Sequence, residues 1–159
     1  MNDGETREGA AVRFPPPIVP LLGLAAGFAL EWVVSPIPNP FASVWRFVVG
    51  GSLTAAGLTL MLMAIGLFRT TGQDPKPWKS SPSLIATGIY KWTRNPMYLG
   101  MGLLQAGIGV LLTNMWVVVL VPGTWFIIYS IAIRHEESYL EQQFGSAYLD
   151  YKNQVRRWI

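Results

Sequence analysis

Long stretches without charge divide this sequence into hydrophobic segments. Residues 18–30, 47–68 and 97–133 contain no Asp, Glu, Lys or Arg. A helix needs about 20 apolar residues to cross a bilayer, and a soluble domain of 159 residues could not cover this much apolar surface. We therefore predict an all-α integral membrane protein with four transmembrane helices, at about 18–34, 43–67, 96–112 and 115–133.

Turn-forming residues mark the ends of these helices. The segment 35–40 holds three prolines and no charge, which predicts a tight turn on the external side. Asn95 is a favourable N-cap residue and Pro96 suits the first helical position, so the third helix should begin there. A Thr-Asn pair at 113–114 predicts a short turn before the fourth helix, which Pro122 should interrupt. The third and fourth helices would thus form a hairpin.

The sequence after residue 133 is polar but keeps a helical pattern. Aromatic and aliphatic residues recur at three- and four-residue spacing, which predicts helices at 134–144 and 146–158, separated by Gly145. Arg157 and Trp158 suit a membrane interface. We expect residues 1–159 to form a single membrane domain, with an amphipathic helical tail on its cytoplasmic face.

The distribution of basic residues predicts the orientation. With four spans, the N-terminal tail, the connection 69–94 and the C-terminal tail share one side and hold eleven of the twelve Lys and Arg residues. Positive residues concentrate on the cytoplasmic side, so we place both termini in the cytoplasm. Arg46 lies at the other side near Glu31, and we expect the two to form an ion pair or to reach the interface.

The composition excludes several kinds of chemistry. The chain has no cysteine, and therefore no disulfide, thiolate metal site or cysteine nucleophile. His135 is the only histidine, so we expect no metal site. The sequence has no phosphate-binding glycine loop with lysine, no serine elbow and no dinucleotide-binding pattern. The first 17 residues lack the features of a signal peptide, and we expect the first hydrophobic segment to be retained.

The two arms of the predicted hairpin have similar lengths. The third helix rises about 26 Å and the fourth, up to His135, about 30 Å, at 1.5 Å per residue. The hairpin therefore returns Glu136 and Glu137 to the level of Arg94 and Asn95. A helix start attracts anions and Arg94 adds to this attraction, whereas the glutamates attract cations. Such a site suits a zwitterionic ligand that carries both a carboxylate and cationic groups.

Each of these residues also has a purely structural explanation. The polar segment 134–137 is typical of a solvated interface, and Arg94 of an interfacial charge. Asn95 and Pro96 could serve only to start a helix, and Tyr90 could belong to an aromatic belt. Spacing alone therefore leaves the function open.

Two motifs, one on either side of the hairpin, reduce the number of possible functions. They comprise Thr87-Gly88-Ile89-Tyr90, Arg94-Asn95-Pro96-Met97-Tyr98-Leu99-Gly100, Glu136-Glu137, Leu140, Phe144-Gly145, Tyr148, Tyr151, Val155 and Arg157-Trp158-Ile159. This pattern resembles the isoprenylcysteine carboxyl methyltransferase and phospholipid methyltransferase-like superfamily of integral membrane enzymes, from about Thr70 to the C-terminus. Some members have histidine before the proline, whereas Asn95 is similar to phospholipid-type and bacterial members. We therefore expect a protein of a prokaryotic inner membrane.

The resemblance implies methyl transfer from S-adenosylmethionine to a lipidic or small hydrophobic acceptor, with the cofactor at the cytoplasmic end of the bundle. Arg94 would orient an anionic acceptor and Glu137 would complete that side, so both are expected to be catalytic. Tyr90 would bound the adenosine, and the start of the third helix would hold the methionine part. The residues implied in cofactor binding are Tyr90, Asn95, Pro96, Tyr98, His135 and Glu136.

Two other functions stay open at this point. Membrane sterol reductases resemble this superfamily in their C-terminal hairpin and use a nicotinamide cofactor, but this chain is much shorter and has no basic cluster for a nucleotide 2′-phosphate. A non-catalytic membrane scaffold that keeps the fold is the other alternative. The acceptor, which could be a prenylcysteine, a phospholipid amine, a small thiol or a quinone-like hydroxyl, is not determined by these residues.

Overall fold

The computed structural model describes residues 9–12, 14–41 and 43–159. These residues form helices and connections, and no strand occurs among them. The elements are α1 (Ile18–Val33), α2 (Ser43–Thr70), the 3₁₀ turn η1 (Gly88–Lys91), α3 (Pro96–Leu111), α4 (Met115–Val119), α5 (Val121–Ile128), the π-helical turn η2 (Tyr129–Ile133), α6 (Arg134–Phe144) and α7 (Ser146–Gln154).

Most helix boundaries lie close to those predicted from the sequence. Helices α1 and α3 agree with the prediction within one residue at each end, and α2 extends three residues further. The fourth hydrophobic helix does not end at Ile133 but continues into α6, so that a helical stretch of 30 residues runs from Met115 to Phe144. The last helix was predicted to reach residue 158, but α7 ends at Gln154 because the chain turns into an extended conformation at Val155.

Two helices are long and apolar enough to cross a membrane, namely α2 and the stretch Met115–Phe144. Helices α1 and α3 are also apolar but shorter. Only 17% of the most apolar window of α2 is buried inside the protein. Large side chains such as Leu62, Trp45 and Phe126 are more than 60% exposed. An exterior of this kind is suited to lipid rather than to water.

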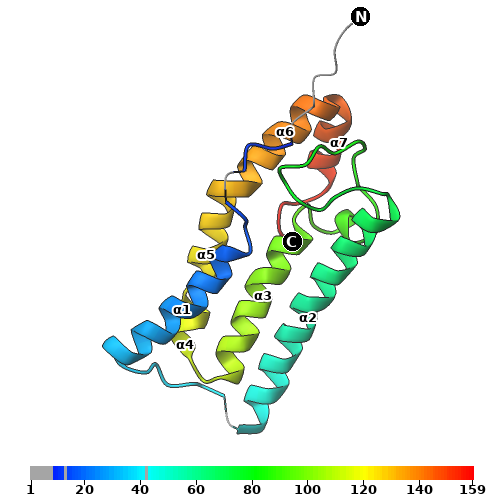
Figure 1. Cartoon of the computed structure of the whole chain (residues 1–159). Coiled ribbons are helices and arrows are strands. Elements are labelled where there is room, and N and C mark those ends of the chain that lie inside the picture. Colours follow the sequence, from blue (N-terminus) through cyan, green and yellow to red (C-terminus); the bar gives the residue numbers. More distant parts are fainter. Residues whose placement is uncertain (1–8, 13, 42) are drawn as a thin grey trace, which may run out of the picture.

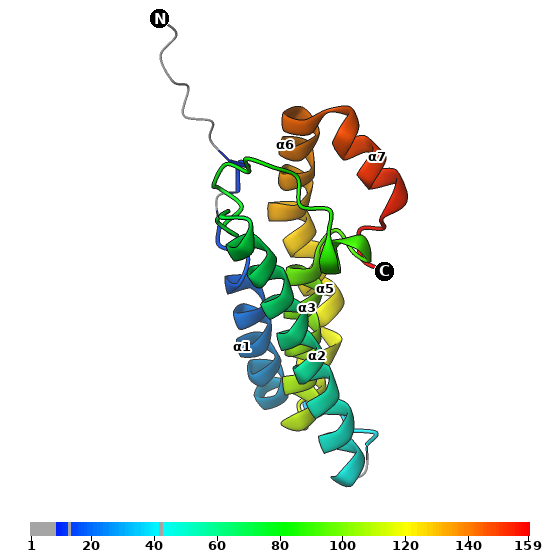
Figure 2. The ribbon, with the colours of Figure 1, turned by 90° about the vertical axis from the view of Figure 1, so that its right-hand side faces the viewer.

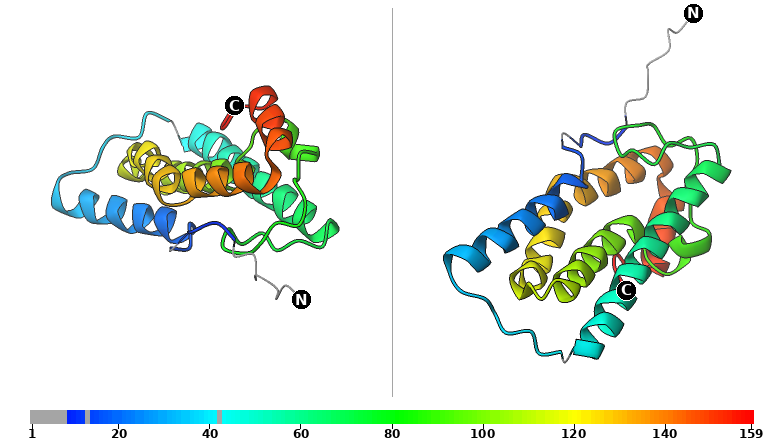
Figure 3. Two further views of the ribbon diagram at one scale, coloured as in Figure 1. Left: turned by 90° about the horizontal axis from the view of Figure 1, so that it is seen from above. Right: turned by 60° about the horizontal axis from the view of Figure 1, so that its bottom comes forward.

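The hairpin of α3 with α4 and α5 forms the centre of the bundle (Figure 1). Helix α1 packs against α3, α4 and α5, whereas α2 packs against α3. Seen from above, α1 and α2 consequently lie on opposite sides of the hairpin (Figure 3). Helices α6 and α7 extend beyond one end of the bundle, where α7 turns back toward α3 (Figure 2). Gly145, with a φ of +53°, makes the predicted break between these two helices.

Glycines allow α2 and α3 to approach each other closely. A Cβ atom on Gly57 would lie 2.6 Å from the carbonyl oxygen of Gly100, and one on Gly100 would lie 2.7 Å from that of Gly57. A Cβ atom on Gly107 would lie 2.6 Å from the backbone nitrogen of Thr54. Small residues at such contacts are the usual basis of tight helix packing in lipid.

The predicted pair of Glu31 and Arg46 does not form among the described residues. Glu31 instead accepts a hydrogen bond from the side chain of Asn114, which also caps α4 by accepting from the backbone N–H of Val117. The guanidinium of Arg46 lies 4.6 Å from the centre of the Phe47 ring. The reason is topological, because α1 and α2 are separated by the hairpin that carries Asn114.

A buried polar pair accompanies the interruption of the fourth hydrophobic helix. Helix α4 ends at Val119 and α5 begins at Val121, so the break lies at Leu120, two residues before the predicted position, and Pro122 occupies the first turn of α5. The side chain of Gln105 donates to the carbonyl of Val117 at 3.1 Å and accepts from Thr124 at 2.9 Å. Side chains from α3 and α5 thus satisfy polar groups inside the bundle, where water is excluded.

We predict that Gly107→Ala destabilises the protein and that Gly51→Ala does not. The added methyl group at Gly107 meets the backbone of Thr54, and overpacking of this kind costs about 1–3 kcal/mol. A Cβ atom on Gly51 meets nothing within 4 Å, so that variant gains up to about 1 kcal/mol from helix propensity. Thermal unfolding in detergent measures both. Equal unfolding temperatures for the two variants would contradict this account of the α2–α3 contact.

Candidate functional site

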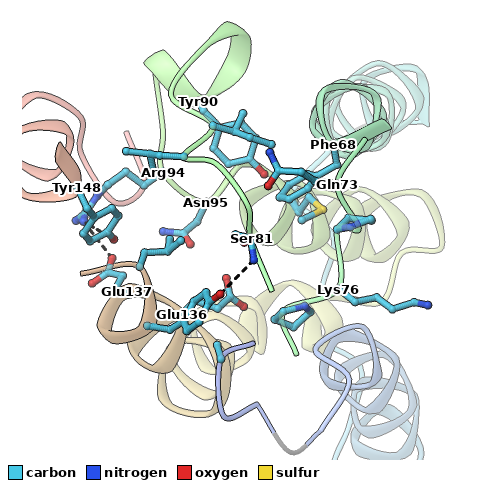
Figure 4. A pocket seen from close by; sticks show the side chains of 18 of the residues that line it. Phe68, Gln73, Lys76, Ser81, Tyr90, Arg94, Asn95, Glu136, Glu137 and Tyr148 are labelled. Atoms are coloured by element: carbon cyan, nitrogen blue, oxygen red, sulfur yellow. Dashed lines mark hydrogen bonds and ion pairs between the residues drawn. The ribbon is translucent and has the colours of Figure 1, made fainter. Parts of the chain in front are cut away.

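A pocket opens at the end of the bundle where α3 begins and α6 starts (Figure 4). It has a volume of about 830 Å³, including space open to solvent. Its walls come from the end of α2, the connection 73–85, η1, the start of α3, α6 and α7, and Ala10 contributes from the N-terminal segment.

A carboxylate shared by two guanidinium groups lies at one side of this pocket. Arg157 donates two hydrogen bonds to Glu137, both of 2.9 Å, and Arg94 lies 3.3 Å from the same carboxylate. The side chains of Arg94 and Glu137 are only 9% and 12% exposed. The two hydrogen bonds to Glu137 raise the pKa of the Arg157 guanidinium above its usual range. This arrangement confirms that the hairpin returns the glutamates to the level of Arg94.

The C-terminal segment is fastened to the residues that precede α3. The backbone N–H of Arg94 donates to the carbonyl of Arg156 at 3.0 Å. The carbonyl of Arg157 accepts from the Thr93 hydroxyl and from the Asn95 side-chain amide, each at 3.1 Å. Asn95 therefore occupies the N-cap position of α3, as predicted, but its side chain does not cap the helix. It binds the C-terminal segment instead.

Aromatic contacts hold the same segment against the hairpin. The ring centres of Trp158 and Trp125 are 5.7 Å apart. Trp125 in turn donates from its indole nitrogen to the carbonyl of Tyr98 at 3.1 Å. The Tyr98 hydroxyl donates to the carboxylate of Glu136 and so connects the two arms of the hairpin. The C-terminal segment and both arms thus form one connected structure around the pocket.

The π-helical turn η2 precedes the two glutamates. Its residue Tyr129 has its ring centre 4.9 Å from the guanidinium carbon of Arg157, and Ala132 and Ile133 are fully buried. Turns of this kind are rare and are often found at functional sites. Here the turn joins the apolar helix α5 to α6, which carries the pocket-lining carboxylates.

Tyrosines of the pocket stay protonated at neutral pH. Burial, and then the charge of Glu137, raise the pKa of Tyr148 to about 12. Burial is also the main cause that raises the pKa of Tyr90 and of Tyr151. The Tyr151 hydroxyl donates a hydrogen bond to the carbonyl of Tyr90 at 2.8 Å and so joins α7 to η1. These hydroxyl groups can donate hydrogen bonds but cannot act as bases.

Two buried polar atoms of pocket-lining residues have no hydrogen-bond partner among the described residues. They are Nε of Arg94, a donor, and Oε1 of Gln73, an acceptor. An unpaired buried polar group costs about 1–3 kcal/mol. The pocket therefore offers one donor and one acceptor that a ligand could satisfy.

The structure brings most of the predicted site residues together. The pocket is lined by Tyr90, Arg94, Asn95, Tyr98, Glu136 and Glu137. Pro96 is buried at the first position of α3 but does not line the pocket. His135 lies outside the lining and accepts from Arg134 at 3.4 Å.

The sequence-based prediction missed Gln73, Tyr148 and Arg157 as residues of this site. Tyr148 and Arg157 belong to the second motif, which is a signal that could have identified them. Gln73 lies in a polar connection without any motif, so no pattern in the sequence distinguishes it.

We predict that Glu137→Gln destabilises the protein more than Glu141→Gln. The first substitution leaves the buried guanidinium of Arg94 beside that of Arg157, which is 35% exposed, without a carboxylate between them. Glu141, in contrast, is 44% exposed and pairs only with Lys152. We expect a loss of about 2–4 kcal/mol for Glu137→Gln, and less than about 1 kcal/mol for Glu141→Gln. Thermal and denaturant unfolding in detergent measure the difference, and similar losses for both variants would contradict it.

Comparison with known proteins identifies the family of this chain. The phospholipid methyltransferase family matches residues 45–147. Protein-S-isoprenylcysteine O-methyltransferase of Saccharomyces cerevisiae is 38% identical over 77 residues, which are 48% of this chain and 32% of the yeast protein. The Xenopus laevis protein of the same name is 33% identical over 132 residues, 80% of this chain and 44% of its own length.

The Dictyostelium discoideum protein of that name is 29% identical over 132 residues, which are 80% of this chain and 54% of that protein. The chain thus spans about a third to a half of the length of these relatives. The family match includes α3, the hairpin turn and α6, and so covers most of the pocket. The chain belongs to the phospholipid methyltransferase family.

Proposed function

We propose that this protein transfers a methyl group from S-adenosylmethionine to a lipidic or small hydrophobic acceptor at the cytoplasmic face of a membrane. The observation that carries the proposal is the pocket at the end of an apolar bundle, lined by Arg94, Glu136 and Glu137 in a chain of this family. In this proposal α1, α2, α3 and the stretch 115–133 span the inner membrane of a prokaryote, with both termini in the cytoplasm.

The polar groups of the pocket fit the charges of this cofactor. S-adenosylmethionine carries a carboxylate, an ammonium and a sulfonium group. The unpaired Nε of Arg94 suits a carboxylate, and the carboxylate of Glu136 suits a cation. Asn95 and Pro96 would fix the start of α3 beside the methionine part. When bound, the cofactor supplies a methyl group on a positively charged sulfur, and positioning provides most of the catalysis of its transfer.

The two glutamates would have different roles. Glu137 is held by Arg94 and Arg157, so it keeps Arg94 in place. Glu136 lines the pocket and accepts a hydrogen bond from Tyr98. We therefore assign Glu136 to the cofactor and Glu137 to the side that orients the acceptor, whereas Arg94 would contact both the carboxylate of the cofactor and the acceptor.

The acceptor is proposed from the family and from the apolar exterior. The names of the relatives denote O-methylation of protein S-isoprenylcysteine, and the family is named for phospholipids. Both are acceptors with an apolar chain that would stay in lipid while its nucleophile reaches the pocket. A carboxylate acceptor needs no general base, whereas an amine must release a proton.

We predict saturable binding of S-adenosylhomocysteine to the purified protein. Arg94→Ala should weaken it about tenfold or more, because a hydrogen bond to a charged group contributes about 1.5–3 kcal/mol. Arg134→Ala is the matched control, since Arg134 is exposed and lies outside the pocket lining. Isothermal calorimetry in detergent measures the three affinities.

The binding experiment can also contradict the proposal. Absence of both heat and a thermal shift at millimolar ligand would exclude this cofactor. Equal losses in Arg94→Ala and Arg134→Ala would remove Arg94 from the binding site. Unfolding temperatures recorded without ligand separate a loss of binding from a loss of structure.

We predict methyl transfer to an acceptor anchored in vesicles. Labelled S-adenosylmethionine is incubated with protein in vesicles that contain an S-isoprenylated cysteine or phosphatidylethanolamine, and products are identified by mass spectrometry. Methylation of either compound, reduced at least tenfold in Glu136→Gln, is the expected result. Binding of the cofactor without transfer to any hydrophobic acceptor would instead favour a non-catalytic protein that keeps the fold.

A further inference from the structure

The connection between α2 and η1 carries a buried amide that has a free acceptor. Gln73 is 7% exposed, and its backbone N–H donates to the carbonyl of Phe68 at 2.8 Å. Its side-chain nitrogen donates to the Ser83 hydroxyl at 2.9 Å and to the Thr71 hydroxyl at 3.3 Å. The side-chain oxygen has no partner among the residues that the structure describes. Since Gln73 lines the pocket, this oxygen is available to a ligand.

The hydrogen bonds to Thr71 and Ser83 use the nitrogen of the amide and leave its oxygen over. The Thr71 hydroxyl donates to the carbonyl of Leu67 at 2.9 Å and accepts from the side-chain nitrogen of Gln73 at 3.3 Å. The Ser83 hydroxyl accepts from the same nitrogen at 2.9 Å. The unpaired atom of Gln73 is thus an oxygen, which requires an N–H or O–H donor.

Aromatic and aliphatic side chains line the pocket together with Gln73, alongside the polar residues Asp74, Lys76 and Ser83. Phe68 and Tyr90 are neighbours in an edge-to-face contact with ring centres 6.1 Å apart, and Leu84 and Met97 line the same pocket. Such walls suit a flat heterocyclic ring. A ring with an exocyclic amino group could occupy the apolar space and donate to Gln73 from its edge.

Gln73 lies across the pocket from the carboxylate of Glu137. Figure 4 shows Gln73 and Phe68 at one side, and Glu137 and Tyr148 at the other. A ligand that uses both sides therefore has a charged part and an aromatic part with a donor. The proposed methyl donor has this composition, because its adenine carries an exocyclic amino group.

We infer that Gln73 selects the base of the cofactor by accepting a hydrogen bond from the exocyclic amino group of adenine. This inference rests on the proposed function and assigns to the 73–85 connection a role in specificity. Hypoxanthine has a carbonyl oxygen where adenine has the amino group, so it would bring an acceptor to an acceptor. Sites that hydrogen-bond a substrate group discriminate strongly against an analogue that lacks it.

The test compares S-adenosylhomocysteine with S-inosylhomocysteine, whose base has a carbonyl oxygen in place of the C6 amino group and an N–H in place of the unprotonated N1. Calorimetry on the full-length protein in detergent gives both affinities. We expect the wild type to bind the adenosine compound at least tenfold more tightly. Gln73→Met, which has a side chain of similar length without an acceptor oxygen, should reduce this ratio to about one.

A second variant keeps the inference testable if Gln73→Met does not fold. Gln73→Glu retains an acceptor oxygen at the same distance from the backbone, and we expect it to keep the preference for the adenosine compound. Unfolding temperatures without ligand identify a variant that has lost its structure. Loss of the preference in a folded Gln73→Glu protein would overturn the inference.

The outcomes separate this inference from the proposed function. If the wild type binds neither compound, the proposed function fails and the role of Gln73 fails with it. If the wild type binds both compounds equally, or if folded Gln73→Met keeps the tenfold preference, only the role of Gln73 is overturned. Binding of the adenosine compound with a preference that disappears in Gln73→Met supports both.

Discussion

The carboxylate of Glu137, shared between Arg94 and Arg157, holds together the end of the bundle that carries the pocket. A carboxylate that is only 12% exposed is strongly destabilising without partners, and the guanidinium groups of Arg94 and Arg157, whose side chains are 9% and 35% exposed, would repel each other without it. The three residues come from the segment before α3, from α6 and from the C-terminal segment. If any one of these segments moves away, the remaining charged side chains lose a partner and the folded state loses stability.

The central position of the α3–α5 hairpin explains the remaining contacts. Because α1 and α2 pack on its two sides, Glu31 of α1 finds its polar partner on the hairpin rather than on α2. Glu31 therefore accepts a hydrogen bond from Asn114 at the hairpin turn, although Arg46 is closer to it in the sequence. Gln105 and Thr124 similarly connect α3 with α5 near the break at Leu120. Closely packed glycines complete the contact with α2.

The hairpin and about half of the residues of the site can be predicted from the sequence. Uncharged segments, Pro96 and Gly145 act locally, so the helices and their ends could be predicted within a few residues. The return of Glu136 and Glu137 to the level of Arg94 followed from helix length alone. The side chain of Asn95 could not be predicted, because its partner is the carbonyl of Arg157, 62 residues away. Gln73 was missed for a related reason, since the connection 73–85 has no periodic pattern that places its side chains.

The π-helical turn η2 has a consequence for the direction of the side chains that follow it. Successive residues of an α-helix are offset by about 100° around its axis. A turn closed by i→i+5 bonds accommodates about one residue more than an α-helical turn does. Helix α6 is therefore rotated relative to α5 when compared with an uninterrupted helix. Without η2 the bundle could keep its length and hydropathy, yet Glu136 and Glu137 would no longer face Tyr98 and Arg94. The positions of the two glutamates in the pocket therefore depend on how far α6 is rotated about its axis relative to α5.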